Sequence, residues 1–335
     1  MGNRKHLWCV GILVFGFAIT TLAQGPVPPT QKPVAQHVQS LMRSGGDALA
    51  AGDASQARTA FTQLLELGRQ NSRLDLVWQA QHGLGRAALA AHDPLLAIEH
   101  LEQSAAAYEQ SGDTSSEAPY RSLTTALMMQ SSSPSDQFVE RAFDSAARAR
   151  AGQQARLRPR ADLAAALRTG DMIVAVLVGD RHAHAWAFDR SSFIGYPLPP
   201  PAEIVTAVER ITAYASHDDR AGVQRIADDL MPALLGPVMD RLSTLQRVIM
   251  VMDGPLRQLS AGDLPLTVRA SSGSHLPSVV TTDDGSLFDE IGRPPSAPAP
   301  PRSGRPVTIR VASAIAVALL ILAGVATLRR RSSIP

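Results

Sequence analysis

The sequence predicts a mixed α/β protein, with helical hairpins in its first half, a small α/β module in its second half and a transmembrane helix near its C-terminus. An internal repeat with an offset of 40 residues predicts the hairpins, and two apolar or alternating runs within residues 171–190 predict the strands. The uncharged run from Val311 to Leu328 predicts the transmembrane helix. Aromatic residues make up only 4% of the chain, which favours helix packing through small residues.

The repeat relates "GDALAAGDASQARTAF", residues 46–61, to "GRAALAAHDPLLAIEHL", residues 85–101. Small residues permit close helix approach, and an aspartate after a tight turn can cap the next helix. A third, degenerate pair is expected at Pro119–Gln130 and Ser135–Ala151, where it would serve as a cap. The aligned positions are Gly45 with Gly85, Ala48 with Ala88, Asp53 with Asp93, Ala57 with Ala97, and Phe61 with Leu101.

This pattern resembles the tetratricopeptide (TPR) family over residues 36–151. The resemblance implies a concave face that binds an extended peptide or a partner helix. By the family's usual facing of the first helix, the residues expected in this groove are Arg43, Gln79, His82 and Arg86. A generic helical bundle, in which these four are only solvated surface residues, stays open.

The second half changes from helical to strand periodicity at residue 171. The expected order is strand, strand, strand, helix, helix, strand, and the first two strands form a hairpin at Gly179-Asp180. The remaining elements are expected at Ser192–Pro197, Ala202–Ala215, Ala221–Leu242 with breaks at Pro232 and Pro237, and Val248–Met252.

Four bulky side chains share one face of the second strand: His182, His184, Trp186 and Phe188. Two imidazoles without a third ligand nearby are packing residues more often than metal ligands. We therefore expect no metal and no cofactor.

The segment "MPALLGPVMDRL" followed by "VIMVMDGPLRQLSAGDLPL" resembles the front portion of a CHAT domain, the caspase-like peptidase family often joined to TPR arrays. The resemblance implies a truncated CHAT-like α/β module at 160–290, in which Asp253 and Gly254 shape a structural turn. The matching positions are Asp253, Gly254, Leu256, Leu259, Leu264 and Pro265.

The chemistry that this resemblance implies requires a His-Gly and a nucleophilic cysteine in a later half, and this chain has neither. After Pro265 the sole histidine is His275, which is followed by Leu276, and the sole cysteine is Cys9. The sequence therefore predicts no enzyme and no catalytic residues. The alternative is a CHAT-family peptidase or peptidase subunit whose catalytic half comes from another chain.

Both ends of the chain are expected to be targeting segments. A signal peptide is expected at 1–23 and a proline-rich lead at 24–35. A proline-rich stalk is expected at 291–306, a transmembrane helix at 307–328 and a basic cytoplasmic tail at 329–335. Val311 to Leu328 would span about 27 Å as a helix, close to the thickness of a bilayer core. The soluble part is then expected outside the cytoplasm, on the periplasmic side, although a processed sorting tail is an alternative for the C-terminus.

The charge distribution argues against a nucleic-acid surface. Residues 1–23 and 307–335 hold six of the 32 basic residues and none of the 30 acidic ones, so the part between is slightly acidic. The predicted function is a membrane-anchored scaffold that docks a protein or peptide partner in the groove of the helical array, without catalysis. The sequence leaves any small-molecule ligand unknown.

Overall fold

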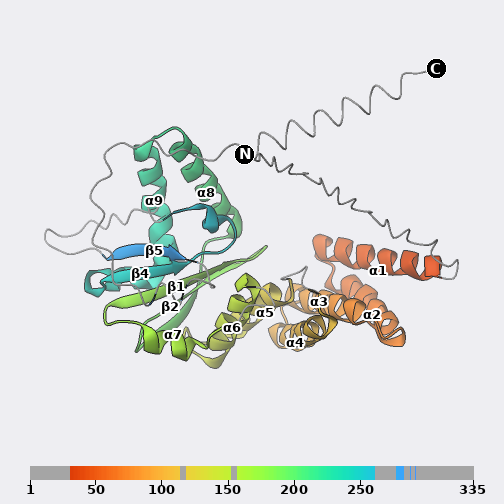
Figure 1. Ribbon diagram of the computed structural model, residues 1–335. Coiled ribbons are helices and arrows are strands. Elements are labelled where there is room, and N and C mark those ends of the chain that lie inside the picture. Colours follow the sequence, from red (N-terminus) through yellow and green to blue (C-terminus); the bar gives the residue numbers. More distant parts are fainter. Residues whose placement is uncertain are drawn as a thin grey trace, which may run out of the picture. The chain divides into compact units, whose positions relative to one another are not determined.

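The computed structural model describes residues 31–113, 118–151, 157–260, 277–282, 287 and 291. Helical hairpins come first and a five-stranded sheet with helices follows, so the fold is mixed α/β (Figure 1). The helices of the first part are α1 (Gln31–Ala51), α2 (Ala54–Gln70), α3 (Leu74–Ala90), α4 (Pro94–Ser111), α5 (Ala118–Gln130) and α6 (Gln137–Ala151). The later elements are α7 (Arg160–Ala166), β1 (Asp171–Val178), β2 (Ala183–Phe188), β3 (Phe193–Pro197), α8 (Pro201–Ser216), α9 (Arg220–Leu235), η1 (Gly236–Thr244), β4 (Arg247–Val251), η2 (Gly254–Gln258) and β5 (Ser278–Thr282).

The two aligned turns of the repeat have the same structure. Gly52 and His92 both take a positive φ, at +78° and +58°. The next residue in each turn caps the following helix: the Gln56 N–H donates to Asp53 over 2.9 Å, and the Leu96 N–H donates to Asp93 over 3.1 Å. Each cap satisfies a backbone donor that the first turn of a helix leaves open, so both hairpins start their second helix in the same way.

The aligned glycines mark where the helices of each hairpin cross. A Cβ added to Gly45 would lie 2.6 Å from the ring of Phe61, and one added to Gly85 would overlap the side chain of Leu101. Ala57 and Ala97 are fully buried at equivalent positions. The helices are this close because these positions carry no larger side chain.

Helix α1 begins earlier than the sequence suggests. It starts at Gln31, so the last five residues of the expected proline-rich lead, 31–35, are helical rather than extended. Pro33 lies in the first turn, where the backbone N–H groups have no partner inside the helix and a proline is tolerated.

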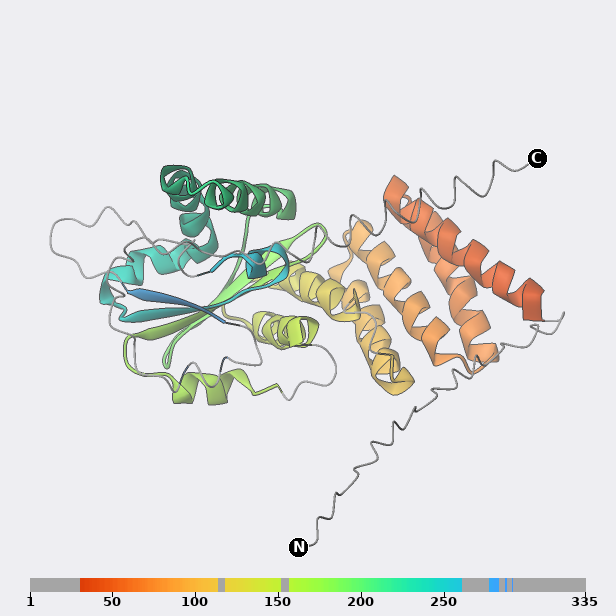
Figure 2. The same cartoon turned by 45° about the horizontal axis from the view of Figure 1, so that its top comes forward.

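The sheet has the order β3-β2-β1-β4-β5. Strands β1, β4 and β5 run parallel, and β2 and β3 are antiparallel to their neighbours on the other side. Helices α8 and α9 cover one face, and α6 and α7 lie on the other (Figures 1 and 2). Every residue of β1, β2 and β4 is buried, because these strands lie between two helical layers.

The later helices of the hairpins, from α3 to α6, share one hydrophobic core with the sheet, whereas α1 and α2 pack in a separate core with α3. Phe143 of α6 makes edge-on contacts with three aromatic rings of the sheet, with centroid distances of 5.4 to 6.2 Å, and these rings are Trp186, Phe188 and Phe193. The sequence predicts that the pair α5–α6 serves as a cap on the array. This prediction is wrong, because α6 is buried against the sheet.

The expected order of strands and helices from residue 171 to Val251 is confirmed, with one correction. The structure adds α7 before this region, and η2 and β5 after it. The correction concerns Pro232, which lies inside α9 without ending it, whereas the helix does end at Leu235, just before Gly236 and Pro237. A proline inside a helix removes one hydrogen bond, and the buried apolar face of α9 compensates for this loss.

No helix of the part of the chain that the structure describes is long and apolar enough to cross a membrane. The expected signal peptide at 1–23, the transmembrane helix at 307–328 and the tail at 329–335 lie outside the described residues. The expected stalk at 291–306 also lies outside them except for Ile291, which is buried.

Candidate functional site

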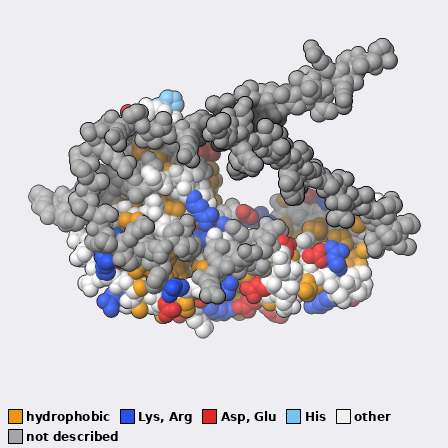
Figure 3. Space-filling model, viewed as in Figure 1, with side chains coloured by type: hydrophobic (Ala, Val, Ile, Leu, Met, Phe, Trp, Pro, Cys, Tyr) orange, Lys and Arg blue, Asp and Glu red, His pale blue; other side chains and the backbone are white. Residues whose placement is uncertain are grey.

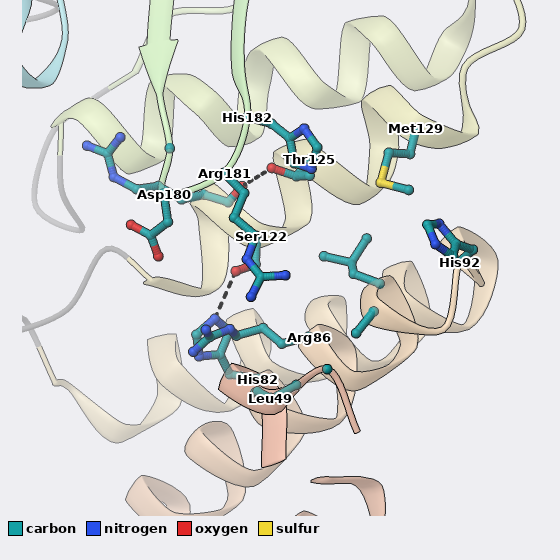
Figure 4. Close-up of a pocket in the computed structure, with 15 residues that line it drawn as sticks. Leu49, His82, Arg86, His92, Ser122, Thr125, Met129, Asp180, Arg181 and His182 are labelled. Carbon is teal, nitrogen blue, oxygen red and sulfur yellow. Dashed lines mark hydrogen bonds between the residues drawn. The ribbon is translucent and has the colours of Figure 1, made fainter. Parts of the chain in front are cut away.

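A pocket of about 720 Å³ lies where the helical hairpins meet the turn between β1 and β2 (Figure 4). Its walls come from the end of α1, from α3, from α5 and from the turn Gly179–His182. We call this pocket the groove. Its lining residues are Leu49, Gly52, His82, Arg86, Leu89, Ala90, His92, Arg121, Ser122, Thr125, Met129, Gly179, Asp180, Arg181 and His182.

The helical wall of the groove repeats every 40 residues. Leu49, Leu89 and Met129 are spaced by this offset and form an apolar row. His82 and Ser122 are related by the same offset, and so are Gly52 and His92. The groove is therefore the inner face of the stacked first helices, because equivalent positions of successive hairpins face the same side.

His82 and Ser122 are joined across two helices. His82 Nε2 lies 2.9 Å from Ser122 Oγ. Burial and, to a smaller extent, the charge of Arg86 lower the pKa of His82 to about 4. The imidazole is therefore neutral near pH 7, and it holds α3 to α5 by a neutral hydrogen bond.

Arg121 fixes the position of the sheet against the groove. Its guanidinium donates to both carboxylate oxygens of Asp253, over 2.7 and 3.0 Å, and to the carbonyl of Val178 over 2.9 Å. The Val178 N–H also donates to Asp253, over 2.9 Å. Since Val178 ends β1 and Asp253 follows β4, one arginine of α5 holds the ends of two parallel strands.

Asp253 is fully buried, and its partners keep it charged. Burial alone would raise the pKa of this carboxyl, but the hydrogen bonds and charge of Arg121, the Val178 N–H and the charge of Arg150 bring the pKa below its usual range. The next residue, Gly254, has a φ of +54°, which is the left-handed conformation that favours glycine. Asp253 thus does more than shape the turn, because it is the acceptor that links the sheet to α5.

The groove carries more positive than negative side chains. Arg86 and Arg181 enter it from opposite walls, one from α3 and one from the turn after β1 (Figure 4). Among the described residues neither guanidinium has a carboxylate partner, and Asp180 is the only acidic residue in the lining. On the face shown in Figure 3, by contrast, the acidic and basic side chains of the described residues are interspersed.

The structure brings two of the four expected groove residues together. His82 and Arg86 line the groove, whereas Arg43 and Gln79 do not. Arg43 is exposed on α1, and Gln79 is half-buried on α3. The sequence interpretation missed the members of the lining that lie one repeat further along, Ser122 and Met129, which adding 40 to His82 and Leu89 would have found. It also missed Arg121, Asp180 and Arg181, for which the repeat carries no signal.

The alternation in residues 183–188 gives the two faces of β2, and His184 is buried as expected, whereas His182 lies just before the strand and is exposed. Trp186 and Phe188 lie in the core shared with α6, whereas Ala183, Ala185 and Ala187 lie in the core under α8 and α9. The rings of His182 and His184 are stacked with centroids 6.4 Å apart. In the part of the chain that the structure describes, no group of three or more His, Cys, Asp or Glu side chains is placed to hold a metal ion.

Comparison with known proteins gives one match to report. No family model matches this chain, and no curated protein matches it. One similar solved structure is the TPR domain of Arabidopsis FLU, at 19% sequence identity and a TM-score of 0.30. The match covers 33% of this chain and 89% of that one. At this TM-score the match supports no argument, so the description of the helical hairpins rests on the caps and crossings given above.

Proposed function

We propose that this protein is a non-enzymatic scaffold that docks a protein partner in the groove. The observation that supports this most strongly is the apolar row Leu49, Leu89 and Met129, which runs across three successive hairpins. It is flanked by Arg86 and Arg181, which have no carboxylate partner among the described residues. Leu49 is buried, but Leu89 is half-buried and Met129 is 39% exposed, so a partner can still cover apolar surface at these two positions.

We further propose that the chain is exported and anchored by a helix at 307–328, with the groove outside the cytoplasm. The uncharged run that ends in three arginines supports this proposal. The α/β part is proposed to be a truncated CHAT-like module, on the strength of the strand that leads into Asp253-Gly254 and of the motif positions given for the sequence. Its proposed role is to hold the β1–β2 turn against the groove.

Site-specific photo-crosslinking tests the docking function. A photoreactive residue at Met129 in the groove should give a discrete adduct with a partner in intact membranes, and the same residue at Gln63, exposed on α2, should not. The adduct at Met129 should vanish when Leu89→Glu is added. Equal adducts at both positions, or none at Met129, would contradict the proposal.

A serine-directed activity probe tests the absence of catalysis. Ser122 is the candidate nucleophile because His82 is within hydrogen-bond distance of it. A histidine whose pKa is about 4 is a weak base, and no carboxylate of the described residues is bonded to its other nitrogen. We expect no labelling of the full chain. Labelling that Ser122→Ala abolishes would overturn the scaffold proposal.

A further inference from the structure

Two cations in the groove point to the chemistry of its partner. The guanidiniums of Arg86 and Arg181 face the same hollow from opposite walls (Figure 4). Both arginines are exposed to solvent, and an anion placed between them would be attracted by two positive charges at once. The apposition of these arginines therefore favours a negatively charged group in the hollow.

The groove does not supply this anion from its own described residues. Asp253 is not part of the lining, and both of its carboxylate oxygens already accept hydrogen bonds from Arg121. Asp180 is exposed and makes no hydrogen bond or ion pair among the described residues. Among the described residues, the groove therefore has one carboxylate without a partner, Asp180, and two guanidiniums without a carboxylate partner, Arg86 and Arg181. Its net charge is positive.

The rest of the lining distinguishes a peptide from a small anion. An inorganic ion would use the arginines and leave the accessible part of the apolar row, Leu89 and Met129, uncovered. A volume of about 720 Å³ is also far larger than such an ion needs, and falls in the range typical of sites for ligands with many atoms. A ligand that matches both the arginines and the apolar row has a carboxylate next to an aliphatic side chain.

We propose that the groove recognises an acidic peptide segment whose aspartate or glutamate lies between Arg86 and Arg181 and whose neighbouring aliphatic side chain covers the apolar row. This inference rests on the proposed docking function and states its specificity. One of the two specificity determinants, Arg181, comes from the α/β part. The sheet therefore contributes to ligand choice, and does more than support the array.

Direct binding of three matched peptides to the full chain tests the proposal. The probes are fluorescent twelve-residue peptides that differ only in composition: glutamate with leucine, glutamine with leucine, and glutamate with serine. The peptide with glutamate and leucine should bind at least about ten times more tightly than either of the others, and its affinity should fall as salt is raised from 50 to 500 mM. Fluorescence anisotropy measures all three affinities.

Charge removal at the two arginines gives the residue-level test. Arg86→Gln with Arg181→Gln should weaken the glutamate–leucine peptide by about ten- to a hundredfold and leave the glutamine–leucine peptide unchanged. Arg58→Gln, an exposed arginine on the outer side of α2, is the matched control and should change neither affinity. Both groove arginines are exposed, so thermal unfolding of the double variant should match that of the parent protein.

The outcomes separate this inference from the proposed function. Equal affinity for the glutamate and glutamine peptides overturns the acidic specificity while peptide docking stands. Tighter binding of the glutamate–serine peptide than of the glutamate–leucine peptide overturns the role of the apolar row. If none of the three peptides binds, the inference is overturned, and the crosslink at Met129 decides whether the docking function fails with it.

Discussion

Within α1–α4 the helices of each hairpin meet through small residues, and the second helix of each hairpin, α2 or α4, begins at a capping aspartate. By contrast, α5 and α6 meet the sheet through two arginines, Arg121 and Arg150, and a group of aromatic rings. The contacts of the first region join residues that lie close in sequence, such as Asp53 and Gln56. The contacts of the second join residues far apart, such as Arg121 and Asp253, which are 132 positions apart. The comparison separates structure that a local pattern specifies from structure that depends on a few long-range side chains.

The largest loss of stability is expected on replacing Arg121, which joins α5 to the sheet. Arg121→Met should lower the free energy of unfolding by about 3 kcal/mol, because it leaves the fully buried carboxylate of Asp253 without its main partner. Urea unfolding measures this loss. The matched control is Arg58→Met, which should stay within about 0.5 kcal/mol of the parent protein.

The pair itself is tested by a second substitution. Arg121→Met with Asp253→Leu should recover part of the loss, since no buried charge then remains unpaired. If Arg121→Met unfolds like the control, the bond between α5 and the sheet does not stabilise the junction and the contrast with the array disappears.

A smaller loss is expected at a crossing inside the array. Gly85→Ala should cost about 1 to 3 kcal/mol, because the new Cβ overlaps Leu101 and the two helices must separate. Gly46→Ala is the matched control, since a Cβ there meets no atom within 4 Å. It should instead stabilise the protein by up to about 1 kcal/mol, because alanine has the higher helix propensity. Equal effects at the two positions in urea unfolding would show that the crossing tolerates a methyl group.

The sequence was sufficient to predict those elements that have a local pattern of residues. The offset of 40 residues placed the two capped turns and the crossings at Gly45 and Gly85. Alternation in 183–188 gave the two faces of β2, because successive side chains of a strand point to opposite sides. Both signals are local, so they survive without knowledge of the tertiary structure.

The remaining features depend on contacts that no local pattern encodes. Strand β5 is five residues long, and its parallel pairing with β4 follows a long connection. Helix α7 has only seven residues, although Pro159 before it and Asp162 in its first turn are start signals that could have been used. The turn that closes the groove with Arg181 lies there because Arg121 holds the end of β1, and residue spacing gives no indication of this.

The pH dependence of stability gives a further test at the junction. Burial lowers the pKa of both His82 and His184 to about 4. The unfolded chain, with histidine pKa values near 6.5, then binds more protons than the folded one between pH 6.5 and pH 4. The stability that the neutral rings provide is therefore complete above pH 6.5, and it should fall by about 3 kcal/mol per histidine as the pH drops to 4.

Thermal unfolding across this pH range measures the effect. His184→Leu should flatten the profile by removing one of the two buried rings, since the ring nitrogens of His184 have no hydrogen-bond partner among the described residues. Replacing the exposed His37 by glutamine should leave the slope as it is. A profile that His184→Leu does not alter would mean that this ring titrates elsewhere.

The smallest effects are expected at the caps, and here the test is whether the two hairpins respond equally. Asp53→Ala and Asp93→Ala should each cost about 1 kcal/mol, because each leaves the same backbone donor without a partner. Asp47→Ala, at an exposed position inside α1, is the control and should cost nothing. The two cap effects should add in the double variant to within about 0.5 kcal/mol, since the two turns share no hydrogen bond. If urea unfolding shows a loss of stability at only one cap, the two hairpins, although equivalent in sequence and geometry, are stabilised by different contacts.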